Sequence, residues 1–296
     1  MLTQAENIVK IEGLLSEIDL NYGSFVKDGR TIDTVSGIIK VKVNQEINHK
    51  EQICEIPVHM FASKYTNAGK INPAYESIEK IMKEYVSIAA SDESKADAIR
   101  ITQGKIVMNE YYRDEKLVSF PRIQASFVTR IKRTEMKPTA TFSTNFVVGS
   151  KSYETDREGV ETGRYRVQGI LPQYGGKVDV VPFYVVSEAA IESISSYWES
   201  YDTVSAVGKL NFSSTTEDYT IPVDFGEPEV RTRTINVSEF IITGGSQEPL
   251  DGERAYNKDD IDAGLAERKQ RLENSKNKSN NNHAATATKP KPNLGF

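Results

Sequence analysis

The sequence predicts an all-β protein with a few short helices, built from two copies of one module. Apolar and polar side chains alternate along most of the chain, and four short motifs of the first half recur in the same order in the second half. With 296 residues, 38% of them hydrophobic, the chain is long enough to bury two modest cores. We therefore expect a first domain over residues 1–135, a second over 136–245, and a C-terminal segment over 246–296.

The internal repeat consists of four matched motifs. In the first half they lie at Val35–Ile39, Ile56–Phe61, Gln103–Ile106 and Ser126–Thr129. Their counterparts in the second half lie at Val167–Leu171, Val181–Val186, Val207–Leu210 and Glu239–Ile242. A single short match carries little weight, but four matches in one order indicate a duplicated module.

Hydrophobic periodicity predicts the same order of elements in both halves. In the first half it predicts strands near 8–20, 32–44, 52–62, 98–112 and 116–132, with a helix over 73–89. In the second half it predicts strands near 139–149, 162–173, 177–186, 202–213 and 229–243, with a helix over 187–198. Each half therefore reads β-β-β-α-β-β. Residues 259–273 have the pattern of a short amphipathic helix, and residues 275–296 have the composition of a disordered tail.

This order of elements is that of the OB-fold, a partly open barrel that binds oligonucleotides or oligosaccharides. Glycines at 37, 104, 169 and 208 lie inside strand patterns, as is typical of the bends of a small barrel. Over residues 7–243 the chain resembles the single-stranded DNA-binding proteins encoded by bacteriophages, in particular those with two tandem OB-folds. The resemblance implies a non-catalytic protein that needs no cofactor. Such a protein coats and protects single-stranded DNA during phage DNA replication or recombination in the host cytoplasm.

Single-stranded nucleic acid is bound by basic residues along its backbone and by aromatic rings that stack on its bases. Residues of these two kinds that fall on outer strand faces or in turns are our predicted nucleic-acid-binding residues: Lys40, Lys42, Tyr111, Tyr112, Arg113, Phe120, Arg122, Arg130, Lys132, Arg164, Arg166, Tyr174, Lys177, Arg231 and Arg233. For the cations, the alternative is a solvated strand face. Tyr111, Tyr112 and Phe120 are equally consistent with the core. Trp198 lies on the apolar stripe of its helix and is expected in the core, whereas Tyr174 is expected at an exposed hairpin tip.

Several other functions lack the residues that they require. Cys54 is the single cysteine, so one chain forms no disulfide and no thiolate cluster. The three histidines, at 49, 59 and 283, have no metal-ligand spacing, and no phosphate loop, zinc-protease motif or nucleophile elbow occurs. The first residues form no apolar run long enough for a signal peptide or a membrane span. We expect a cytoplasmic protein with no metal, no membrane contact and no enzymatic activity.

The C-terminal segment is a candidate partner-binding region. Bacterial single-stranded DNA-binding proteins end in acidic residues followed by Pro-Phe, whereas here Lys289 and Lys291 precede the terminal Phe296. We expect replication or recombination proteins as partners of residues 259–296, with contact of the basic tail to nucleic acid, or plain solubilisation, as alternatives. A different class of function, a structural or assembly protein that uses its barrels for protein contacts, also fits the fold.

Overall fold

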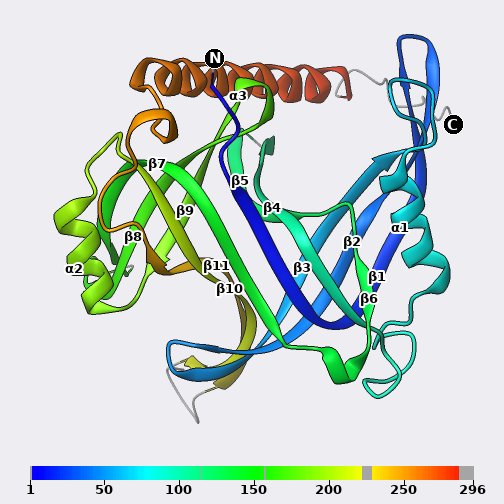
Figure 1. Ribbon diagram of the computed structural model, residues 1–296, viewed down its shortest axis with the longest axis horizontal. Helices are drawn as coiled ribbons and strands as arrows, with labels where there is room; N and C mark the ends of the chain where they lie inside the picture. Colours follow the sequence, from blue (N-terminus) through cyan, green and yellow to red (C-terminus); the bar gives the residue numbers. More distant parts are fainter. Residues whose placement is uncertain (1, 114, 157, 222–228, 287–296) are drawn as a thin grey trace, which may run out of the picture.

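Two β-barrels stand side by side, and a long helix crosses one end of both (Figure 1). The structure is a computed structural model, and it describes residues 2–113, 115–156, 158–221 and 229–286. Strands make up most of these residues, and each half has the predicted order β-β-β-α-β-β. The all-β class with two OB-fold barrels is therefore confirmed.

The first barrel is closed by a return pairing between its first and fourth strands. Its elements are β1 (Asn7–Lys27), β2 (Arg30–Ile47), β3 (Lys50–Ser63), α1 (Pro73–Glu84), β4 (Ala98–Arg113), β5 (Lys116–Gln124) and β6 (Thr129–Ile131), followed by a 3-10 turn at Arg133–Glu135. The strand order is β1-β2-β3-β5-β4, and β4 also pairs with β1. This is the Greek-key order of an OB-fold barrel.

The strand predicted over 116–132 is wrong as a single element. Lys116–Gln124 forms β5, which pairs with the Lys105–Arg113 end of β4, whereas Thr129–Ile131 forms β6, which pairs with the opposite end at Ala98–Arg100. After β5 the chain must therefore pass from one end of β4 to the opposite end before it forms β6. It does so through residues 125–128, where Ala125 and Val128 are buried, and their apolar pattern explains why the sequence reads as one strand.

The second barrel has the same closure. Its elements are β7 (Thr139–Thr155), β8 (Glu161–Pro172), a 3-10 turn at Tyr174–Gly176, β9 (Val178–Val185), α2 (Glu188–Tyr197), β10 (Thr203–Ile221) and β11 (Glu229–Gly245). The strand order is β7-β8-β9-β11-β10, and β10 pairs back to β7. Strands β10 and β11 form a longer hairpin than β4 and β5 do.

The cores follow the predicted alternation. Val35, Ile39, Val41 and Val43 on one face of β2 are fully buried. In the second barrel Phe146 stacks on Phe183 with their ring centroids 4.8 Å apart, and Phe142 and Phe240 pack edge to face at 5.8 Å. Trp198 is buried beside Phe146, and its Nε1 donates a hydrogen bond of 2.9 Å to the carbonyl of Ser246. The prediction that Trp198 lies in the core is confirmed.

The fourth motif of the repeat does not match in space. Phe240 is fully buried in β11, whereas its sequence counterpart Phe127 lies between β5 and β6 and is 53% exposed. In the parallel pairings Val58 is opposite Ile123 and Phe183 is opposite Phe240. Ile123 is therefore the structural counterpart of Phe240. The short motif at 126–129 resembles the other by composition alone.

The two barrels are joined by backbone and side-chain contacts. Strand β1 pairs with β7 from Asn7↔Thr144 to Glu12↔Thr139, so one sheet runs through both barrels. The Gln45 side chain donates to the carbonyl of Leu210 at 2.8 Å and accepts from the N–H of Ala140 at 3.1 Å. These hydrogen bonds place the β2–β3 hairpin of the first barrel beneath the second barrel (Figure 1).

Helix α3 (Lys258–Thr286) crosses the top of both barrels (Figure 1). Ile261 is fully buried against Val147, Ile170 and Val178 of the second barrel. The helix is longer than the predicted 259–273 and includes residues 275–286, which the sequence predicts to be disordered. Those residues contain almost nothing to bury, so composition does not reveal that the preceding helix continues into them. Residues 287–296 of the predicted tail lie outside the described residues.

Candidate nucleic-acid interface

The strand register defines an outer face on the first barrel. Ile38 of β2 is opposite His59 of β3, which is opposite Gln124 of β5, which is opposite Lys105 of β4. Paired residues project from the same side of a sheet, and alternate residues project from the other side. The alternate residues Ile39, Val58, Ile123 and Ile106 are fully buried. The row Ile38–His59–Gln124–Lys105 therefore faces outward.

A groove lies at the end of this face, beside the β1–β2 hairpin. Its volume is about 910 Å³, and we name it the hairpin groove. Its lining residues include Phe25, Lys27, Arg30, Phe61 and Tyr65. Phe25 is opposite Ile32, and Phe61 is opposite Ser36, four residues further along β2, so both rings lie on the outer face. The side chains of Phe25, Phe61 and Tyr65 are 43%, 49% and 52% exposed.

The charges of the hairpin groove are mainly positive. Lys27 and Arg30 flank the Asp28-Gly29 turn, whose φ angles of 50° and 74° are those of a two-residue hairpin turn. Neither cation forms an ion pair with any residue that the structure describes. Lys64 pairs with Asp33 at 3.6 Å and lies 5.8 Å from the centroid of the Tyr65 ring. Asp28 is an acid in the lining. The groove thus combines exposed rings with two unpaired cations.

Sequence reasoning missed the residues of the hairpin groove. The Asp28-Gly29 turn between two alternating strands was the available signal, because it marks a hairpin tip. In an OB-fold this tip is the loop between the first two strands, which commonly contacts the ligand. The partners of Phe25 and Lys27 across the groove come from the β3–α1 connection, and only the three-dimensional structure brings that segment to them.

The β4–β5 hairpin carries five of the predicted residues. Tyr111 and Phe120 are 38% and 40% exposed, so they are not core residues. The pairings Asn109↔Phe120 and Tyr111↔Val118 place both rings and Arg122 on the same outer face as Lys105 and Gln124. Tyr112 lies on the other face, where the Lys276 ammonium of α3 is 5.8 Å from its ring centroid. Arg113 is exposed close to the tip. Their contact with nucleic acid stays a prediction.

Arg122 also changes the electrostatics of the outer face. Burial lowers the pKa of His59, and the positive charge of Arg122 lowers this pKa further. His59 is therefore neutral at physiological pH. The positive charge on this part of the outer face comes from Arg122 and Lys105 rather than from the histidine.

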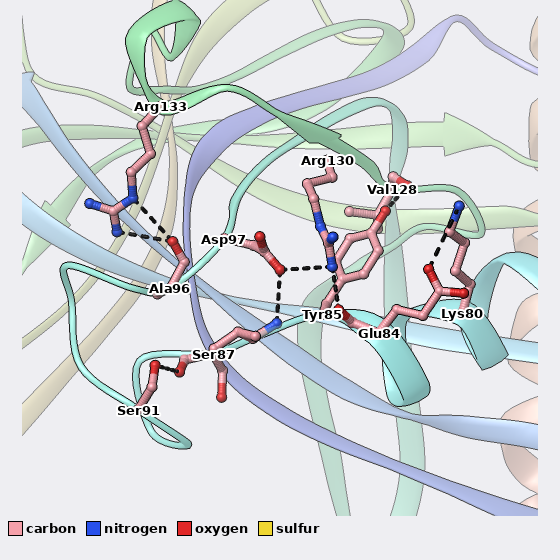
Figure 2. A network of polar contacts seen from close by, with 11 residues as sticks. Lys80, Glu84, Tyr85, Ser87, Ser91, Ala96, Asp97, Val128, Arg130 and Arg133 are labelled. Atoms are coloured by element: carbon pink, nitrogen blue, oxygen red, sulfur yellow. Dashed lines mark hydrogen bonds and ion pairs between the residues drawn. The ribbon is translucent and has the colours of Figure 1, made fainter.

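Arg130 has partners within the protein (Figure 2). Its Nη2 lies 3.0 Å from Oδ2 of Asp97 and donates to the carbonyl of Glu84, and its guanidinium centre lies 4.4 Å from the Tyr85 ring centroid. Oδ2 of Asp97 also accepts from the N–H of Val86 at 2.8 Å. These contacts tie β6 to the end of α1. Arg130 therefore has a structural role, which differs from the solvated strand face that the sequence left as its alternative.

Other predicted cations are likewise paired with acids. The distances between charged atoms are 2.6 Å for Lys40–Glu17, 2.7 Å for Lys42–Glu93, 3.5 Å for Lys132–Glu135, 2.8 Å for Arg164–Glu239 and 3.1 Å for Arg233–Glu217. Arg164 also lies 4.8 Å from the Tyr184 ring centroid. A paired cation must exchange an existing partner for a phosphate, so its net contribution to binding is smaller.

The remaining predicted residues belong to the second barrel. Arg166 is exposed opposite Tyr184 and forms no ion pair within the described ranges. Arg231 is exposed opposite Tyr219. Tyr174 is 85% exposed, as predicted for a hairpin tip. Tyr174 and Lys177 line a cavity of about 460 Å³ together with Lys105 and Gln124 of the first barrel.

A comparison of the sequence with protein families gives one match, which covers most of the chain. The family model named YorF matches residues 5–278. The chain belongs to the YorF family. A comparison with curated proteins gives no match for this YorF-family chain.

Solved structures similar to this YorF-family chain include two of one protein. The wild-type single-stranded DNA binding protein from Thermus aquaticus has a TM-score of 0.48 at 11% identity, over 87% of this chain and 99% of that one. Its delta 228-252 R190A deletion mutant has a TM-score of 0.46 at 12% identity, over 84% of this chain and 97% of that one. The OB-fold assignment of the YorF-family chain rests on its own strand order and closure.

Two other kinds of feature, a metal site and a membrane-spanning helix, are absent from the described part of this YorF-family protein. Within the described residues no group of three or more His, Cys, Asp or Glu side chains is placed to hold a metal ion. None of the helices in that part of the chain is long and apolar enough to cross a membrane. Three surface features bear the predicted or newly found candidate residues: the outer face of the first barrel, the hairpin groove, and the cavity beside Tyr174.

Proposed function

We propose that this YorF-family protein binds single-stranded DNA on the outer face of its first barrel, without catalysis. One observation carries the proposal. The hairpin groove combines the exposed rings of Phe25, Phe61 and Tyr65 with Lys27 and Arg30, two cations that form no ion pair among the described residues. It lies at the β1–β2 loop and on strands β2 and β3, where OB-folds bind oligonucleotides.

The chemistry of the groove favours a single strand over a duplex. Unpaired bases expose their faces, and stacking on an aromatic ring stabilises the complex by about 1–3 kcal/mol per base. Lys27 and Arg30 supply the phosphate contacts, whose strength falls as salt rises. Every base has a face that stacks, so binding is largely independent of sequence.

The wider setting of this proposal comes from the resemblance of the sequence. The protein coats and protects single-stranded DNA during phage DNA replication or recombination in the host cytoplasm. Residues 259–296 are its contact with replication or recombination proteins. This setting depends on DNA binding, so the binding test comes first.

The test is a titration of a fluorophore-labelled oligo(dT) of about 30 nucleotides, followed by anisotropy at low salt. We expect Phe61→Ala to weaken binding by about tenfold, and Phe25→Ala with Phe61→Ala to weaken it further, because each ring stacks on a base. The matched control is Tyr197→Ala, which removes a ring of similar exposure, 46%, from α2 of the second barrel. The control should bind like the unchanged protein.

Two outcomes would contradict the proposal. If the unchanged protein binds no oligonucleotide at low salt, single-stranded DNA is not its ligand, and the structural or assembly role becomes the better reading. If the protein binds but Phe61→Ala and Tyr197→Ala behave alike, the hairpin groove is not the site. Competition with RNA and with duplex DNA ranks the ligand classes in the same assay.

A further inference from the structure

We infer that the single-stranded DNA bound in the hairpin groove continues into a second binding site between the two barrels. This inference rests on the proposed function and deepens it. Two cavities of about 460 Å³ and 630 Å³ share Lys177 and Arg271 in their linings, and we name them together the interbarrel cleft. The first barrel, the second barrel and helix α3 each supply one wall.

The interbarrel cleft gathers three cations from three separate elements. Lys105 belongs to β4, Lys177 precedes β9, and Arg271 belongs to α3. None of the three forms an ion pair with a residue in the described part of the chain. Side-chain amides of Gln4, Gln124, Gln173, Gln270 and Asn274 also line the cleft, and that of Gln173 donates to Asp179 and to the carbonyl of Ile106. Unpaired cations among amide donors suit an anionic polymer.

Two of the three acids of the cleft accept hydrogen bonds from neighbouring residues. Glu110 accepts hydrogen bonds from Arg268, with 3.0 Å between Nε and Oε2. Asp179 is buried and accepts from the N–H of Met108 at 3.0 Å and from Nε2 of Gln173 at 3.1 Å. Glu267 is the remaining acid in the lining. With Glu110 paired to Arg268, the cleft sets three cations against the two acids Asp179 and Glu267.

Tyr174 supplies the ring for a base in this cleft. It stands at the tip of the β8–β9 turn, where Gly175 and Gly176 have φ angles of 79° and 80° that other residues rarely adopt. Its side chain is 85% exposed, so it contributes little to the core. A fully available ring beside unpaired cations is the combination that single-strand sites use.

The outer face of the first barrel connects the two sites. Phe61 in the hairpin groove is two residues from His59 on β3 and lies on the same face. His59 is opposite Gln124, and Gln124 is opposite Lys105 in the cleft. The step from β3 to β4 crosses two strand spacings, or about 10 Å. A DNA strand that leaves Phe61 and crosses this row therefore reaches Lys105. Tyr174 lines the same cavity as Lys105.

The outer face of the second barrel is a weaker candidate for this second contact. Arg164 is held by Glu154 and Glu239, and Arg233 is held by Glu217. Those guanidinium groups must give up an acid to bind a phosphate, whereas Lys105, Lys177 and Arg271 need not. One arginine of each pair is thus held by acids, and the part of the second barrel that we assign to the contact is its β8–β9 turn.

The experiment compares two oligo(dT) lengths, of about 8 and about 30 nucleotides, because one OB-fold occupies about 4–16 nucleotides. We expect Tyr174→Ala to weaken binding of the long oligonucleotide by about tenfold and to leave the short one unchanged. Lys105→Gln, Lys177→Gln and Arg271→Gln together should lower the slope of log affinity against log salt by about 2 for the long oligonucleotide. The matched control is Lys80→Gln, Lys95→Gln and Arg254→Gln, which removes the same charge from cations paired with local acids.

The outcomes separate this inference from the proposed function. If the unchanged protein binds neither length, the proposed function fails. If it binds both, and the cleft variants match the control with the long oligonucleotide, the interbarrel site is wrong while the proposed function stands. Thermal unfolding confirms that each variant is folded, and the unchanged affinity for the short oligonucleotide provides a second check within the same assay.

Discussion

Phe127 and Phe240 show how a single residue's environment departs from its sequence context. Both occupy the second position of matched motifs, yet Phe240 has no exposed surface and contacts the rings of Phe142, Phe183 and Phe212. Phe127 is 53% exposed in the segment between β5 and β6. Burial of a phenylalanine side chain in a closely packed cluster is a main source of stability, and an exposed ring provides little.

We expect Phe240→Ala to lower the free energy of unfolding by about 3–5 kcal/mol, because it removes a buried ring and leaves a cavity. Phe127→Ala should change it by less than about 0.5 kcal/mol. Urea unfolding of both variants measures the difference. Equal losses would show that the repeat is in register at this position after all.

At the scale of elements, α3 joins the two barrels. Its first part packs on the second barrel through Ile261, and Gly264 lies so close to Val178 that an added Cβ would stand 2.7 Å from Cγ1 of that residue. Further along, Arg268 binds Glu110 of the first barrel, whose side chain is only 5% exposed. The helix therefore holds one wall of the interbarrel cleft in place.

Arg268→Leu should detach α3 from the first barrel, because it leaves the Glu110 carboxylate buried without its cation. The cost is about 2–3 kcal/mol, which raises the rate of tryptic cleavage at Lys269 and Arg271 by about 30- to 150-fold through local opening of the helix. Arg254→Leu, which removes an exposed ion pair, is the control and should leave the rate unchanged. Adding Glu110→Leu to Arg268→Leu should restore protection. A helix that stays protected in the single variant would rule out this role for the ion pair.

At the scale of the molecule, one sheet runs through both barrels. The β1–β7 pairing, the Gln45 hydrogen bonds and the Ala5 N–H bonded to the carbonyl of Pro172 at 3.0 Å all cross between them. Main-chain pairing of this extent removes polar groups from water on both sides, and separation of the barrels would expose them. The barrels should therefore unfold together.

This expectation can be tested with the single tryptophan. Trp198 is buried in the second barrel and reports on that barrel alone, whereas far-ultraviolet circular dichroism reports on both. We expect the two signals to give coincident urea transitions, as required for one cooperative unit. A tryptophan transition displaced from the dichroism transition would show that the barrels unfold independently.

The fold was predictable from sequence because its determinants are local. Three features each depend on residues close together in the sequence: the alternation around Val35 and Ile39, the apolar helix stripe ending at Trp198, and the hairpin tip at Tyr174. The division between β5 and β6 was not predictable, because it depends on which end of β4 each segment meets. Among the candidate site residues, the exposure of Tyr111 and Phe120 was left open by the sequence and decided by the strand register.

The sequence by itself determined two OB-fold barrels, their element order and which residue types are available for binding. Only the tertiary structure decided which of those residues are free. Arg130 and Arg164 look like Lys27 and Arg30 in the sequence, but the first two meet acids from distant segments, whereas the last two form no ion pair with a residue that the structure describes. Local patterns are set by neighbours in the chain, whereas charge pairing and grooves are set by contacts between segments far apart in it. This is why the hairpin groove and the interbarrel cleft emerged only from the structure.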